Sequence, residues 1–231
     1  MKRILIILAA ALTISACKEK AQLQNMRCEY QAEPINIDCT QPRFSWEYTA
    51  ADDFQKAYTV EVAASEDFSD IIWTSGRVED DATLVKYQGG PLESFTTYWW
   101  RVSTEMESGC RLNAAPQKFE TAMMPGYEWQ AQWISDSNDK DFAPAPMVRK
   151  SFNLAQKPAR ARLYISAAAY YKLSVNGAPV SGITLDPGYT VYSRTYLYSS
   201  YDITAYIYTG ENVIGAVLGN GFYNEIEPVA T

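Results

Sequence analysis

The chain has 231 residues, of which 47% are hydrophobic and 13% aromatic, a composition typical of globular proteins and sufficient for two domains. Its 20 Lys and Arg residues are outnumbered by 27 Asp and Glu residues. Such an acidic surface repels phosphate backbones, so we expect no nucleic-acid partner.

The sequence contains no histidine. This excludes the commonest general base, the commonest transition-metal ligand, and every Ser-His or Cys-His nucleophile pair. A P-loop, a dinucleotide-binding fingerprint and a closely spaced cysteine pair for zinc are also missing from the sequence. We therefore expect no cofactor and no bound metal.

The N-terminus has the features of an export signal. Lys2 and Arg3 are basic, residues 4–12 form an apolar run, and small residues lead from there to Cys17. The apolar run is too short to span a bilayer permanently. We therefore predict a signal peptide at residues 1–16.

The segment ISAC at residues 14–17 resembles a bacterial lipobox, in which the cysteine is lipid-modified and becomes the mature N-terminus. Acyl chains on Cys17 would hold the protein to a membrane without a transmembrane helix. We expect a lipidated tether at residues 17–25 and a location on the periplasmic or the cell-surface face of the outer membrane. The alternative is a plain secretory signal cut near Ala16.

Three further cysteines would lie in an oxidising compartment. Cys28 and Cys39 flank Pro34 at a spacing that lets the chain fold back and close a disulfide. Cys110 follows a glycine in a predicted turn and would be left over. The alternative is that all three are small residues that fill space without forming a bond.

Residues 26–122 show short apolar strands separated by turn residues, the pattern of an all-β domain. The predicted turns lie at residues 65–70, 89–91 and 107–109. Period-two alternation predicts one buried face in each of three strands. These faces are Phe44, Trp46 and Tyr48; Tyr58, Val60, Val62 and Ala64; and Tyr98, Trp100, Val102 and Thr104.

Four residues have the spacing of the fibronectin type III pattern: Leu92, Thr96, Tyr98 and Val102. The resemblance implies a fibronectin type III-like, immunoglobulin-like β-sandwich over residues 26–122. In such a domain the Tyr98 hydroxyl bonds to the backbone just upstream and fixes the start of its strand. Proline and glycine in MMPG at residues 123–126 then end the domain.

Three tryptophans of this block invite a sugar-binding interpretation: Trp73, Trp99 and Trp100. Trp100 alternates with core residues, so we predict that it is buried. Trp99 points to the opposite face of the strand, where burial and ligand contact are equally reasonable.

The second block, residues 127–231, contains the clearest alternation in the chain. We predict one long half-buried strand over residues 160–175, followed by a tight hairpin turn at Asn176-Gly177. Seven of its residues fall on one face: Leu163, Ile165, Ala167, Ala169, Tyr171, Leu173 and Val175.

Five segments of this block together resemble the N-terminal β-sandwich domain of bacterial α-L-rhamnosidases, glycoside hydrolase family 78. They are YYKLSVNG at 170–177, LDPGYT at 185–190, YDIT at 201–204, GENVIG at 210–215 and LGNGFY at 218–223. One departure is Phe222, which stands where the family usually has tryptophan. The resemblance implies a jelly-roll-like, galactose-binding-like β-sandwich over residues 127–231, truncated at its C-terminal side.

The resemblance also implies a function. Members of the family remove terminal α-L-rhamnose from glycans, and their catalytic acids lie in a helical (α/α) barrel that follows these domains. No residue of this chain therefore inherits a catalytic role. We expect an N-terminal anchor, spacer and support for an exported enzyme that acts on rhamnose-containing glycans. The alternatives are a non-catalytic surface glycan-binding lipoprotein and an inactive truncated product.

The carboxylates of the second block have ordinary explanations in the sequence. They are Asp186, Asp202, Glu211, Glu225 and Glu227. Asp186 precedes Pro-Gly and Asp202 precedes a β-branched residue, placements that favour turns. We therefore predict structural or solvated roles for this set rather than acid/base catalysis.

The segment around Asn220 is the better candidate for a functional surface. Glycine on either side of Asn220 would let a ligand approach the backbone closely, and Phe222 and Tyr223 could stack on a sugar ring. We therefore name Asn220, Phe222 and Tyr223 as candidate carbohydrate contacts. A turn without a ligand is the alternative, because Asn-Gly is a strong turn former.

Overall fold

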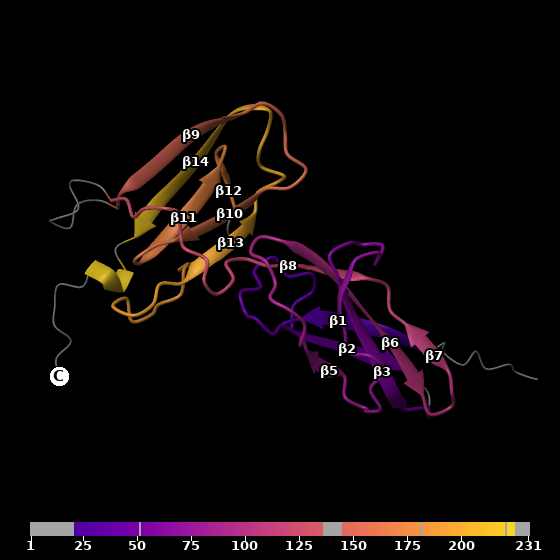
Figure 1. Cartoon of the computed structure of the whole chain (residues 1–231). Coiled ribbons are helices and arrows are strands. Elements are labelled where there is room, and N and C mark those ends of the chain that lie inside the picture. The colour runs from indigo at the N-terminus through magenta and orange to yellow at the C-terminus, as the bar shows by residue number, and fades with distance from the viewer. Residues whose placement is uncertain (1–20, 51, 136–144, 181, 220, 225–231) are drawn as a thin grey trace, which may run out of the picture. The chain divides into compact units, whose positions relative to one another are not determined.

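A computed structural model of the chain describes residues 21–50, 52–135, 145–180, 182–219 and 221–224 (Figure 1). These residues form antiparallel β-sheets and one short 3₁₀ helix, which confirms the predicted all-β class.

The contacts divide the chain into two units. The first contains Gln41–Pro91, Thr97–Phe119 and the residues before Pro34; the second contains Pro34–Thr40, Leu92–Thr96 and the residues from Glu120 onward. Two short segments and the end of the last strand of the predicted first domain therefore belong with the second unit. The boundaries predicted at 26–122 and 127–231 stay predictions.

The first unit consists of two sheets. One has the order β1-β2-β5, with β1 Gln22–Cys28, β2 Arg43–Thr49 and β5 Leu84–Lys86. The other has the order β4-β3-β6-β7, with β4 Ile71–Thr74, β3 Gln55–Ala63, β6 Thr97–Met106 and β7 Arg111–Asn113. The strand β8, Gln117–Glu120, pairs with β6.

Aromatic side chains fill the core of the first unit, as the alternation predicts. Every second residue of β6 is buried, including Trp100, whose ring centroid lies 4.7 Å from that of Phe44. Trp46 is also buried and donates its indole N–H to the Gln55 side chain at 2.9 Å. Trp99 is half-buried on the opposite face of β6.

The alternation fails at the end of β3. Ala64 was expected on the buried face, but it is exposed, and Ala63 is fully buried instead. The cause is an irregularity in the pairing of β3 with β4 between Val62 and Ala63, which shifts the register by one residue. Because side chains alternate with a period of two, such a shift exchanges the two faces.

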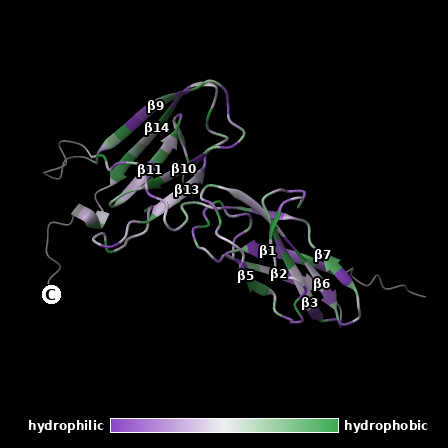
Figure 2. Ribbon diagram, viewed as in Figure 1, coloured by the Kyte–Doolittle hydropathy of each residue, from purple (hydrophilic) through white to green (hydrophobic). Residues whose placement is uncertain are grey.

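The second unit contains a four-stranded sheet with the order β12-β11-β14-β9 and a two-stranded sheet, β10-β13. Their bounds are β9 Met147–Leu154, β10 Arg162–Ser166, β11 Tyr170–Val175, β12 Ala178–Pro179, β13 Tyr198–Asp202 and β14 Gly210–Gly219. The 3₁₀ helix η1, Gly221–Asn224, follows β14. Figure 2 shows hydrophobic and hydrophilic residues interspersed along β9, the edge strand of the larger sheet.

The single long strand predicted over residues 160–175 is wrong. The chain forms β10 and β11, which belong to different sheets: β10 pairs with β13, and β11 pairs with β14. Residues 167–169 separate them, and Ala169 has a positive φ of 115°. The apolar alternation runs through the break, because both strands turn apolar side chains toward the interior of the unit.

The predicted hairpin at Asn176-Gly177 is confirmed. Val175 pairs with Ala178, and both turn residues have positive φ, 52° and 81°, as a two-residue hairpin turn requires. The Asn176 side chain also donates to Asn212 at 2.9 Å. Asn212 is fully buried, and its amide further bonds the backbone of Tyr208 and Gly210.

Candidate functional site

The second unit contains a pocket of about 520 Å³. Its walls come from the segment before β9, from β10 and the β10–β11 connection, and from the end of β14. Aromatic rings and small side chains dominate its lining: Trp129, Trp133, Tyr164, Tyr171, Tyr196 and Tyr223, with Ala131, Ala167, Ala168, Ala216 and Gly219. Polar groups are few and include Gln132 and Ser166. An apolar hollow with a few polar groups is typical of small-molecule sites.

A set of touching aromatic residues, called the aromatic patch below, continues from the pocket. It consists of Trp133, Tyr189, Tyr192, Tyr196, Phe222 and Tyr223. The Trp133 and Tyr196 centroids are 4.8 Å apart, and Tyr196 stacks on Tyr192 at 5.6 Å. Tyr192 meets Tyr223 edge-on, also at 5.6 Å. Much of this aromatic area is exposed, including 63% of Trp133.

The structure brings two of the three predicted sugar contacts to this region. Tyr223 lines the pocket, and Phe222 contacts Tyr189 at a centroid distance of 5.1 Å. Asn220 lies outside the described residues. Sequence reasoning missed Trp133 and Tyr196, although the tryptophans in WQAQWI at 129–134 and the tyrosines at 189–196 were visible signals.

Gly221 is glycine for a packing reason. Its φ is +44°, and a β-carbon there would lie 2.9 Å from the Ala169 β-carbon and 3.1 Å from the Tyr170 ring. The close approach is therefore to the protein's own β10–β11 connection and β11. A β-carbon on Gly219 would meet nothing closer than 3.8 Å.

Of the structural and solvated roles expected for Asp186, the structure places it in a buried, structural one. It is only 6% exposed, and its carboxylate accepts hydrogen bonds from three hydroxyl groups: Tyr171 at 2.8 Å, Ser199 at 2.6 Å, and Tyr201. Burial is the main cause that raises the pKa of the Tyr171 phenol far above its ordinary value; Ser199 lowers this pKa, whereas Tyr201 and Asp186 raise it further.

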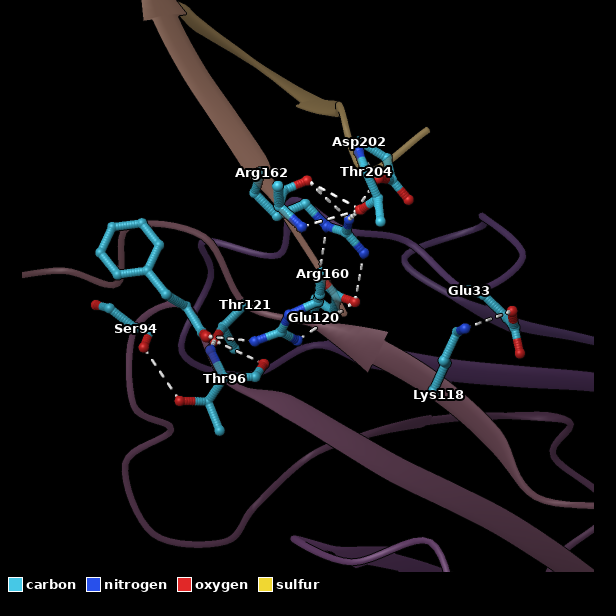
Figure 3. A network of polar contacts seen from close by, with 12 residues as sticks. Glu33, Ser94, Thr96, Lys118, Glu120, Thr121, Arg160, Arg162, Asp202 and Thr204 are labelled. Carbon is cyan, nitrogen blue, oxygen red and sulfur yellow. Dashed lines mark hydrogen bonds and ion pairs between the residues drawn. The ribbon is translucent and has the colours of Figure 1, made fainter. Parts of the chain in front are cut away.

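A second buried cluster is ionic. Glu120, at the end of β8, accepts two hydrogen bonds from Arg162 at the start of β10, each 2.8 Å long (Figure 3). Arg162 also pairs with Asp202 at 2.7 Å, and Arg160 approaches Glu120 at 3.5 Å. Burial alone would lower the pKa of Arg162, but its bonds to Glu120 offset this and the net pKa is raised. Such full pairing is typical of a structural ion pair.

The other predicted site residues within the described ranges are not among those that line the pocket. Cys28 is buried in β1, Cys39 is half-buried, and Cys110 is exposed in the β6–β7 turn. The predicted disulfide between Cys28 and Cys39 stays a prediction. Glu211 is exposed on β14. Cys17, Glu225 and Glu227 lie outside the described residues.

Within the described ranges, no group of three or more Cys, Asp or Glu side chains is placed to hold a metal ion. The same part of the chain contains no helix that is long and apolar enough to cross a membrane.

Family models match both parts of the chain. One, described as the Rha78A-like N-terminal immunoglobulin domain, matches residues 23–125. The other, described as the α-L-rhamnosidase N-terminal domain, matches residues 156–229.

Curated relatives agree with these matches. An α-L-rhamnosidase from Formosa agariphila is 32% identical over 256 residues, covering 95% of this chain and 27% of the relative. An α-L-rhamnosidase from Streptomyces avermitilis is 30% identical over 221 residues, covering 83% of this chain and 21% of the relative. The chain thus spans about a quarter of the length of these relatives.

Solved structures show the same partial coverage. The α-L-rhamnosidase from Dictyoglumus thermophilum superimposes with a TM-score of 0.78 at 32% identity, covering 86% of this chain and 25% of that one. The enzyme from Aspergillus terreus gives 0.74 at 27% identity, covering 88% and 24%. The chain therefore contains the N-terminal immunoglobulin-like domain and the N-terminal β domain of α-L-rhamnosidases.

Proposed function

We propose that this chain serves as the N-terminal, non-catalytic part of an exported α-L-rhamnosidase, where it anchors, spaces and supports a catalytic domain. The observation that carries the proposal is the match of two N-terminal domain models, in order, to most of the chain. Rhamnose-containing glycans are the proposed substrates of the whole enzyme, and the catalytic barrel is the proposed partner domain.

The buried carboxylates support a non-catalytic role. Hydrolysis of a glycosidic bond uses two carboxyl groups on either side of the bond, one to donate a proton and one to attack or to activate water. Among the described residues the buried acids are Glu120 and Asp186. Glu120 is occupied by Arg162, and Asp186 is occupied by three hydroxyl groups. Each oxygen of both carboxylates already accepts at least one hydrogen bond from the protein.

A chimera tests the supporting role. In this chimera, residues 21–231 replace the matching N-terminal quarter of the Formosa agariphila α-L-rhamnosidase. Its hydrolysis of an aryl rhamnoside and its thermal stability are measured. The parent enzyme and a deletion variant that lacks the N-terminal quarter are the two references. We expect the chimera to fold and to retain most of the activity that the deletion loses. A chimera no better than the deletion would contradict the proposal.

A second candidate function is glycan binding at the pocket, and the aromatic patch is the observation that favours it. Exposed rings such as Trp133 and Tyr223 can stack on the apolar face of a sugar, because their hydrophobic surfaces are large and rigid. Gln132 and Ser166 supply polar groups for sugar hydroxyls. A surface lipoprotein with such a pocket would retain glycans near the membrane without cutting them.

Calorimetric titration with L-rhamnose and rhamnose-containing oligosaccharides tests this second function. Tyr223→Ala, Trp133→Ala and Asn220→Ala should weaken binding, whereas Tyr208→Ala, which removes an exposed tyrosine outside the pocket, should leave it unchanged. No binding at millimolar sugar would rule out the glycan-binding role and leave the supporting role in place.

We also propose that Cys17 is lipid-modified after removal of residues 1–16, so that the protein is membrane-anchored on the periplasmic or the outer face. Labelled palmitate fed to expressing cells should enter the protein, and Cys17→Ser should abolish the label. Unchanged labelling of the Cys17→Ser variant would contradict this anchor.

A further inference from the structure

We propose that Asp186 is a positioning residue for residues 188–197, called the aromatic loop below. Its carboxylate holds this loop against the two sheets of the second unit. The aromatic loop carries Tyr189, Tyr192 and Tyr196, half of the aromatic patch. The inference concerns the mobility of this loop and does not depend on the function proposed above.

The three donors to Asp186 come from both sheets. Tyr171 belongs to β11 of the four-stranded sheet, and Ser199 and Tyr201 belong to β13 of the two-stranded sheet. The two phenol oxygens lie 3.0 Å apart, side by side on the same carboxylate. One carboxylate therefore connects the start of the aromatic loop to two separately paired sheets.

The backbone reinforces the same contact. The Tyr171 amide donates to the Asp186 carbonyl at 3.0 Å, so residue 186 is bound by both its main chain and its side chain. At the far end of the aromatic loop, Ser166 donates its hydroxyl to the Leu197 carbonyl at 2.7 Å. The loop is thus held at two points, each on the border of the pocket, because Tyr171 and Ser166 both line it.

The charge of Asp186 is what allows three donors to converge. An ionised carboxylate only accepts hydrogen bonds, whereas an amide of the same shape presents one acceptor and one donor. Within the described part of the chain, Asp186 forms no ion pair with Lys or Arg; the groups that face it are the hydroxyls of Tyr171, Ser199 and Tyr201. Replacing one carboxylate oxygen by an NH2 group therefore leaves at least one of these hydroxyls facing a donor, to which it cannot donate.

Between these two points the aromatic loop contacts the rest of the unit through exposed or half-exposed rings: Tyr189 on Phe222, Tyr192 on Tyr223, and Tyr196 on Trp133. Its internal hydrogen bonds join Val191 to Arg194 and Thr195, and Thr190 to Thr195. Several of its large apolar side chains are exposed, including 61% of Tyr189. Segments with few buried apolar contacts open at low free-energy cost, so the end points decide how often the loop opens.

Hydrogen exchange of the chain, measured by mass spectrometry, tests whether Asp186 holds the aromatic loop in place. Asp186→Asn should speed exchange of peptides within residues 188–197 by about tenfold or more, the effect of losing one hydrogen bond to a charged group. Exchange in β14 should stay unchanged. Asp67→Asn is the matched control, because Asp67 also accepts a serine hydroxyl bond, from Ser69 at 2.7 Å, but in a turn of the first unit.

Ser199→Ala provides a second variant that keeps the charge and removes one donor, and it should speed loop exchange by less than Asp186→Asn. Unchanged exchange in residues 188–197 in both variants would overturn the proposal. Equally faster hydrogen exchange in the aromatic loop and in β14 would also overturn it. That result would mean that Asp186 stabilises the whole second unit and does not specifically hold the aromatic loop. If Asp186→Asn does not fold, the Ser199→Ala result alone decides between these outcomes.

Discussion

Glu120 and Arg162 form a two-pronged ion pair, with Nε and Nη2 of the arginine each 2.8 Å from a different carboxylate oxygen. The glutamate side chain is 6% exposed and the arginine side chain 13% exposed. The pair joins residues that are far apart in the sequence, at the end of β8 and the start of β10. Residue Glu120 is thereby fixed within the second unit.

Breaking this pair should destabilise the protein strongly. Glu120→Gln removes the buried carboxylate from Arg162, which keeps its ion pair with the exposed Asp202, and it should cost about 1.5–3 kcal/mol of unfolding free energy. Urea unfolding of the chain measures the loss. The exposed pair of Arg77 with Glu79 gives the control, and Arg77→Ala should change stability little.

The Glu120→Leu, Arg162→Met double variant should recover most of that loss, because apolar side chains of similar volume avoid the desolvation cost of two buried charges. A double variant as unstable as Glu120→Gln would show that the pair contributes through geometry that apolar packing does not replace.

Adjacent tryptophans of β6 should differ in their contribution to stability. Trp100 is 1% exposed and packs against Phe44. Trp100→Ala should lower the free energy of unfolding by about 3–5 kcal/mol because of the cavity it leaves. Trp99→Ala, on the half-buried face, should cost clearly less. Equal losses in a denaturant titration would contradict the assignment of the two faces.

Asn212 should be among the most sensitive polar residues of the second unit. Asn212→Ala leaves the Tyr208 amide without its acceptor and removes one of the bonds of the Asn176 side chain, at about 1–3 kcal/mol for an unsatisfied buried group. Asn153→Ala, on the exposed face of β9, is the control and should be nearly neutral. Thermal unfolding of both variants compares them directly. An unchanged unfolding temperature in Asn212→Ala would contradict the stabilising role of the Asn212 hydrogen bonds.

Gly221→Ala should disturb the 3₁₀ helix that carries Phe222 and Tyr223. The added β-carbon would lie 2.9 Å from that of Ala169, so the helix must shift, at about 1–3 kcal/mol. In Gly188→Ala the new atom meets Leu197 at an ordinary 3.5 Å, and little should change. Faster hydrogen exchange at residues 221–224 in the first variant alone is the expected result.

Buried phenols give the protein a defined response to alkali. Burial is the main cause that raises the pKa of Tyr164, Tyr171 and Tyr198 above the ordinary value. The folded state then keeps protons that the unfolded state releases above about pH 10, so stability is present below that pH and is lost as the pH rises.

Absorbance at 295 nm during an alkaline titration should therefore show some tyrosines ionising later in the folded chain than in denaturant. Tyr171→Phe should remove one of the tyrosines that ionise late in the folded chain. Simultaneous ionisation of all tyrosines while the circular dichroism remains native would contradict this account.

Local patterns predicted most of the strands, because a buried face forces period-two alternation wherever one strand stays in one sheet. The prediction failed where pairing partners changed. Ile165 and Tyr171 continue one alternation, yet they lie in different sheets, and no local signal marks the change at Ala169. At Ala64 a one-residue shift of register against β4 had the same effect.

The site was predictable only in part for a similar reason. Tyr223 stood in a recognisable motif, but Trp133 and Tyr196 reach the pocket through the tertiary fold. Asp186 looked like a turn residue because its sequence neighbours are Pro and Gly, whereas its hydroxyl partners are supplied by β11 and β13. Glu120 and Arg162 are likewise separated by more than a strand and its connections.

The proposal that this chain has a non-catalytic role is tested most directly by incubating the purified 231-residue protein with an aryl α-L-rhamnoside. The Formosa agariphila α-L-rhamnosidase serves as the positive control. We predict no release of the aryl group above the rate without protein. If an activity that co-purifies with the chain releases the aryl group with saturable kinetics, the result would contradict the proposal.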